Sequence, residues 1–126
     1  MATPQTLFKT AAILNAIFVP AHIVFGLTDV HPAINSIPST PQHRIGQRGA
    51  QNCYNYVNAS LLVAALLNWQ WARTGGPQTR EEMAVFWTIL GIGLWSGLRY
   101  VQVGEFKPLG CLVLAPACSV AALFML

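Results

Sequence analysis

Four long apolar runs restrict this chain to folds that have lipid as their solvent. They are Leu7 to Leu27, Ala59 to Ala72, Met83 to Val103 and Pro108 to Leu126. A helix rises about 1.5 Å per residue and needs about 20 apolar residues to cross a hydrocarbon core about 30 Å thick. The first, third and fourth runs meet this length, and the second meets it only together with its polar lead-in.

Composition supports the same class. The chain is 54% hydrophobic and only 9% charged, whereas about 25% of the residues of a typical soluble domain are charged. We expect a single all-α domain of 126 residues, an integral membrane four-helix bundle with up-down-up-down order and a long first loop. Its spans are predicted at about 7–27, 51–72, 83–103 and 108–126, and the first is expected to stay as an anchor because it is long enough to span.

The segment TDVHPAINSIPST, rich in turn-forming residues, is predicted to be the first loop, at the membrane surface. Thr40 and Pro41 then form a helix start signal. A helix that runs unbroken from Pro41 to about Ala72 is roughly 48 Å long, which exceeds the hydrocarbon thickness. Its first turns must therefore project beyond the apolar core or line a protein cavity.

The stretch RIGQRGAQNCYNYVN, at residues 44–58, places its polar side chains on one face of this helix. On a wheel of 100° per residue, these side chains fall within about 120°. They are Arg44, Arg48, Gln51, Asn52, Asn55 and Asn58. We name this set the polar stripe, and its amides either line a cavity or join neighbouring helices by hydrogen bonds.

Helix order brings most of the polar residues to one end of the bundle. The predicted first and third loops share that end, which holds Asp29, His31, His43, Arg44, Arg48, Asn52, Asn55, Arg99, Tyr100, Glu105 and Lys107. His22 lies on the same side, and an intramembrane histidine is a functional candidate by default. At the opposite end Thr79 and Glu82 predict a capping box. We therefore expect a polar cavity open at one membrane face, with His22, Arg99, Tyr100 and Glu105 as catalytic candidates.

Several other functions are disfavoured. The net charge of +3 is scattered, which argues against nucleic acid as a partner and favours contact with lipid headgroups. The three cysteines, at 53, 111 and 118, have no CxxC spacing and are interpreted as packing residues. His22, His31 and His43 have no recognised metal-ligand spacing, so no metal site is predicted.

Residues 48–56, RGAQNCYNY, resemble the second-helix signature of the MAPEG family of small four-helix membrane enzymes. The resemblance implies a homotrimer in the membrane of the endoplasmic reticulum, if the source is eukaryotic, with glutathione held between subunits. Arg48 and Asn52 match the motif, and Arg44 stands four residues before Arg48 rather than three. Asn55 occupies the position of the motif's glutamate. The resemblance thus implies these four residues for cofactor binding.

Two functions follow from these patterns. The first is an enzyme that acts on a small lipophilic substrate, as an isomerase, a cyclase or a thiol transferase. Guanidinium and amide donors would stabilise a developing anion, and a histidine or Glu105 would move a proton. The second is a non-catalytic membrane module that binds lipid, assists folding of a partner or forms part of a transporter. Packing asparagines and interfacial arginines would suffice for the second.

Overall fold

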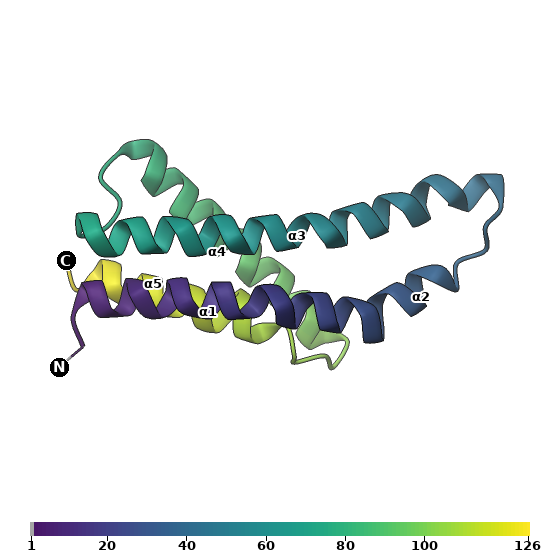
Figure 1. The fold of residues 1–126 in the computed structure, drawn as a ribbon, viewed down its shortest axis with the longest axis horizontal. Helices are drawn as coiled ribbons and strands as arrows, with labels where there is room; N and C mark the ends of the chain where they lie inside the picture. The colour runs from purple at the N-terminus through teal and green to yellow at the C-terminus, as the bar shows by residue number, and fades with distance from the viewer. Residues whose placement is uncertain (1) are drawn as a thin grey trace.

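The computed structural model describes residues 2–126, and these residues form helices and no strand. The predicted all-α class is confirmed. The elements are α1 (Pro4–Phe25), η1 (Gly26–Val30), α2 (His31–Asn35), α3 (Pro41–Thr74), α4 (Arg80–Gln102), η2 (Gly110–Leu114) and α5 (Ala115–Phe124). The π-helical segments η1 and η2 join their neighbours without a break, so the chain forms four rods (Figure 1).

The first rod, α1 with η1 and α2, lies alongside α3, and α5 packs on α1 (Figure 1). Successive rods alternate in direction, which leaves both chain termini at the same end as the turn between α3 and α4. Helix α4 is inclined to the others and contacts mainly η2. Helix α3 has 34 residues and is about 51 Å long. Its N-terminal part extends to the opposite end of the molecule, beside α2.

The predicted long first loop is wrong in extent, because the helix continues through it to Asn35. A proline within a helix has no N–H to donate and its ring displaces the carbonyl four residues earlier. Here η1 widens the turn just before Pro32, and the His31 N–H reaches back five residues to the Gly26 carbonyl. This π turn accommodates Pro32, so only residues 36–40 are left to connect the two rods.

The last rod repeats this arrangement. Its π segment η2 precedes Pro116 by two residues, and the Ala115 N–H donates to the Gly110 carbonyl. The carbonyl four residues before Pro116 belongs to Leu112, and it lies against Gly93 of α4. A Cβ added to Gly93 would lie 2.9 Å from this oxygen, which is closer than such contacts allow. Glycine at position 93 therefore lets α4 approach the last rod.

Two helices start where the sequence predicts, and one of these starts has a side-chain cap. Thr79 accepts a hydrogen bond from the Glu82 N–H at 3.1 Å, which is half of the predicted capping box. The Glu82 carboxylate bonds instead to the Gln78 N–H at 2.6 Å. Thr40 precedes α3 as predicted, but its hydroxyl pairs with the His43 ring at 2.8 Å rather than with the helix backbone.

The best-packed region lies at the end that holds the termini. Phe8 and Trp71 are almost completely buried, with ring centroids 6.1 Å apart, and Phe86 lies 5.7 Å from Trp71 on the other side. Ala72 and Ala122 complete this core. All four rods are thus joined at this end, whereas α3 and α4 diverge toward the other end.

We predict that Gly93→Ala lowers the free energy of unfolding by about 1–3 kcal/mol, because the new methyl group meets the Leu112 backbone rather than a movable side chain. The measurement is chemical unfolding in detergent micelles. Gly91→Ala is the matched control, since a Cβ there has open space and alanine favours the helix by about 0.5–1 kcal/mol. Equal effects of the two substitutions would contradict the close approach.

Candidate functional site

His22, on the last turns of α1, is joined to α3 by its imidazole. Its Nδ1 lies 2.9 Å from the Asn58 side-chain oxygen. An amide oxygen only accepts, so Nδ1 carries the proton and Nε2 keeps a lone pair. His22 is half-buried, and Nε2 has no hydrogen-bond partner within residues 2–126. The arrangement fixes the tautomer and leaves one nitrogen able to take up a proton.

Tyr54, one turn before Asn58 on α3, holds the His22 ring in place. The two rings stack with centroids 4.1 Å apart and an angle of 12° between their planes. The Tyr54 hydroxyl donates to the His22 backbone carbonyl at 2.8 Å. Gly26 makes room for this ring, because a Cβ there would lie 2.5 Å from the tyrosine Cε1. Tyr54 and Asn58 together set the position and orientation of the imidazole.

A second histidine borders Tyr54. His31 of α2 meets its ring edge-on at 5.6 Å, and the His31 Nε2 is buried without a partner in the described chain. We name His22, His31, Tyr54 and Asn58 the histidine–tyrosine cluster.

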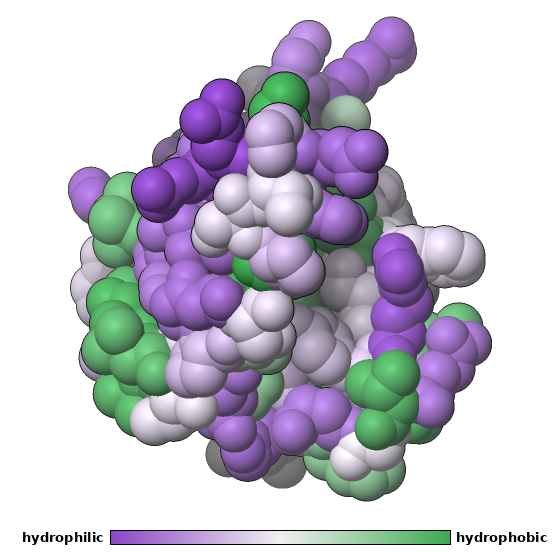
Figure 2. Space-filling view, turned by 90° about the vertical axis from the view of Figure 1, so that its right-hand side faces the viewer, coloured by the Kyte–Doolittle hydropathy of each residue, from purple (hydrophilic) through white to green (hydrophobic). Residues whose placement is uncertain are grey.

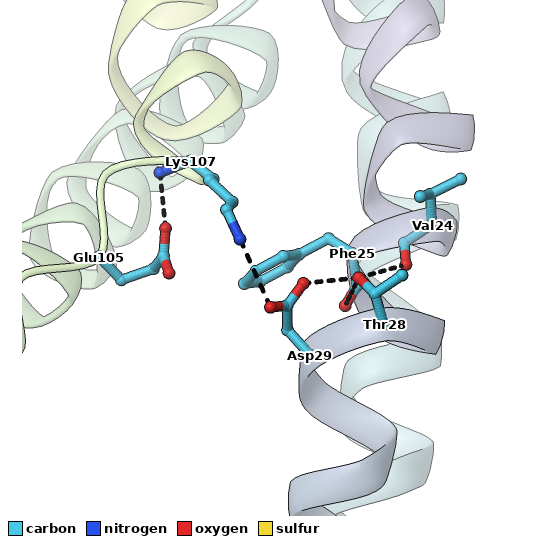
Figure 3. Close-up of polar contacts among 6 residues, drawn as sticks. All are labelled: Val24, Phe25, Thr28, Asp29, Glu105 and Lys107. Atoms are coloured by element: carbon cyan, nitrogen blue, oxygen red, sulfur yellow. Dashed lines mark hydrogen bonds and ion pairs between the residues drawn. The ribbon is translucent and has the colours of Figure 1, made fainter.

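A second contact holds the turn between α4 and η2 against the first rod (Figure 3). Lys107 lies 3.4 Å from the Asp29 carboxylate and 5.3 Å from the centre of the Phe25 ring. Glu105 accepts a hydrogen bond from the Lys107 N–H at 3.0 Å. Thr28 also donates to Asp29. The Glu105 carboxylate is therefore engaged within its own turn, and Asp29 is paired.

The structure divides the polar stripe between two directions. Gln51 donates to the Asn35 side chain at 2.9 Å, and Asn58 bonds to His22, so these two residues face the first rod. The remaining four members are exposed. They are Arg44, Arg48, Asn52 and Asn55, the residues implied for cofactor binding.

Three of these exposed residues, Arg44, Arg48 and Asn52, border a shallow hollow on α3 together with Ile45 and Gly49. Arg48 also donates to Gln51 at 3.2 Å. Hydrophilic side chains cover much of the end of the molecule formed by α2 and the start of α3 (Figure 2). In residues 2–126 no hydrogen bond connects this hollow with the histidine–tyrosine cluster.

The four catalytic candidates have different surroundings. The His22 ring stacks on Tyr54, and the Glu105 backbone N–H donates to the Tyr100 carbonyl at 3.0 Å. Arg99 is exposed and forms no hydrogen bond or ion pair with the described residues. No group of three metal-binding side chains occurs in the part of the chain that the structure describes. Of the four candidates, His22 is therefore the one held by contacts within the histidine–tyrosine cluster.

Tyr54 contacts His22 but is not predicted by the sequence patterns. It lies four residues before Asn58 and so shares a helix face with it. That spacing, with a histidine on the neighbouring helix, was the available signal. The polar stripe does not contain its ring, because that stripe consists of amide and guanidinium side chains alone.

We predict that Tyr54→Phe lowers the free energy of unfolding by about 0.5–1.5 kcal/mol, because the ring stack stays while the hydrogen bond to the His22 carbonyl is lost. Thermal or chemical unfolding in micelles measures this loss. Tyr56→Phe is the control, since Tyr56 is 74% exposed on the other side of the same helix. If both substitutions have the same effect, the Tyr54 hydroxyl does not stabilise the pairing of α1 with α3.

Comparison with protein-family models, with curated proteins and with solved structures finds no match to this chain. The MAPEG resemblance, with its glutathione site and homotrimer, therefore stays a prediction.

Proposed function

We propose that this protein is an integral membrane enzyme with four spans that moves a proton on a small lipophilic substrate. Two helical stretches, Pro4–Asn35 and Arg80–Gln102, are long and apolar enough to cross a membrane, and Gly110–Phe124 is a shorter apolar helix. The second half of α3 is also apolar. Large hydrophobic side chains face outward on every rod, including Ile17, Leu66, Ile92 and Leu114, which favours lipid contact over water.

The observation that carries the catalytic proposal is the state of the His22 ring. Asn58 holds the proton on Nδ1 and Tyr54 fixes the ring plane, so Nε2 is presented as a base. We assign His22 as the catalytic residue and Asn58 and Tyr54 as positioning residues. The Asn58 oxygen also stabilises the imidazolium that forms when Nε2 takes a proton.

The reaction that suits one such base is an isomerisation next to a carbonyl group. His22 Nε2 removes a proton from the carbon beside the carbonyl, and the electron pair of that C–H bond forms an enolate. The same proton then returns to another carbon of the conjugated system, so no co-reactant is consumed. Tyr100, which is half-buried in α4, is the donor that we assign to the enolate oxygen.

A second candidate is the thiol transferase that the MAPEG resemblance implies. The hollow between Arg44, Arg48 and Asn52 supports it, because guanidinium and amide donors suit the carboxylates of glutathione. In this proposal a second copy of the chain covers the exposed amides of Asn52 and Asn55, which need hydrogen-bond partners in a membrane. The same surface would instead serve packing alone in a non-catalytic module.

The test uses a β,γ-unsaturated steroid ketone with the full-length protein in liposomes, since its conjugated isomer has a distinct ultraviolet absorbance. We expect turnover by the wild type and a loss of about 100-fold or more in His22→Gln, the range of general-base contributions. His43→Gln is the matched control, because His43 is exposed and bonded to Thr40. Equal rates in protein-free liposomes, or full activity of His22→Gln, would overturn the catalytic proposal.

A further inference from the structure

The bundle contains a cavity that the proposed reaction does not use. It has a volume of about 290 Å³ and lies between α3, α4 and the last rod, on the side of α3 away from the exposed polar stripe. Its walls include Leu61, Trp71 and Gly93, and its polar lining includes Asn15, Asn68 and Ser119. Apolar walls with a few convergent polar groups are typical of small-molecule sites.

The cavity arises from the inclination of α4. Near their connecting turn α3 and α4 touch, through Trp71 with Phe86 and through a hydrogen bond of 2.8 Å from Gln70 to Glu82. Further along, α4 rests on η2 at Gly93 instead of on α3 (Figure 1). The space is therefore a wedge that closes at Trp71 and widens toward Val57 and Ser96. In a membrane, the wide side faces lipid.

Two of the buried polar residues satisfy each other at the inner wall. The Ser119 hydroxyl donates to the Asn68 oxygen at 2.7 Å, and the Asn68 amide nitrogen donates to the Ala64 carbonyl at 2.9 Å. These bonds join α3 to α5 and explain why polar residues are tolerated here. The Asn68 oxygen therefore already has a donor from within the bundle.

Asn15 is different. Only 5% of its surface is exposed, and its amide nitrogen donates a hydrogen bond of 2.9 Å to the Ala11 carbonyl of its own helix. The Asn15 oxygen is thereby directed away from the α1 backbone, and it has no hydrogen-bond partner among residues 2–126. The oxygen is not among the fully buried atoms, and Asn15 lines the cavity, so in a lipid surrounding a donor from a bound molecule is favoured.

We propose that this cavity binds a lipophilic alcohol, with its hydroxyl donating to the Asn15 oxygen and its apolar body lying between α3 and α4. The hydroxyl supplies the donor that Asn15 lacks, and the wide side of the wedge admits a molecule directly from the bilayer. A cavity of about 150 Å³ is known to hold benzene, so 290 Å³ accommodates a chain of medium length. Asn15 lies seven residues before His22, about 10 Å along α1, so this site is separate from the catalytic base.

The probe is a photoreactive diazirine derivative of octanol, used with the full-length protein in liposomes and mapped by mass spectrometry. We expect adducts on the cavity-lining residues of α3 and α4, and competition by octanol but not by octane. Asn15→Leu is expected to reduce labelling about fivefold, the loss of one hydrogen bond. Asn55→Leu, a change of the same kind at an exposed position, is expected to label as the wild type does.

Ser60→Phe, at an exposed lining position, is a second variant that blocks the cavity without removing a buried polar group. It is also expected to abolish the adducts. Adducts spread evenly over lipid-facing residues, or equal competition by octane, would overturn the proposal. His22→Gln is expected to label normally, so a failed assignment of the catalytic base leaves this test unaffected.

Discussion

The contact of Tyr54 with His22 and Gly26 fixes the pairing of α1 with α3, and the other elements are arranged around that pair. The tyrosine ring fits against the helix only because position 26 has no side chain, and its hydroxyl and the Asn58 amide then bond to the same histidine residue. These are two hydrogen bonds and one ring stack between the same two helices. In a lipid surrounding such polar contacts are made within the protein, because the hydrocarbon offers no alternative partner.

Two prolines, Pro32 and Pro116, also determine the shape of the bundle. Pro32 and Pro116 each follow a π-helical turn, and each turn widens the helix enough to keep the rod continuous. In the last rod the displaced Leu112 carbonyl meets Gly93, which sets where α4 rests. The inclination of α4 follows from this contact, and the cavity beside Asn15 follows from the inclination. A local backbone feature thus determines where a ligand has space.

The sequence predicted the helical class and the starts at Pro41 and Thr79, because caps and apolar runs are local signals. It did not predict that the first rod would continue to Asn35, since Pro32 is a typical loop residue and the π turn that accommodates it has no clear signature. The polar stripe was predicted as one wall, but Gln51 and Asn58 turn toward the first rod while Arg44 and Arg48 face outward. An arc of 120° on a wheel is wide enough to cover both directions, and only the position of α1 separates them.

The central claim is that the rods cross a membrane in alternating directions, and cysteine labelling tests it most directly at the two inner rods, α3 and α4. In a chain whose three native cysteines are replaced by serine, Gln42→Cys, Arg80→Cys and Phe106→Cys are each treated with a membrane-impermeant maleimide in sealed vesicles. Four spans place residues 42 and 106 on one side and residue 80 on the other, so only one of these sets is labelled before permeabilisation. If residues 42 and 80 are labelled together and residue 106 is not, or if residue 106 alone is labelled, α3 does not cross the membrane and the account is wrong.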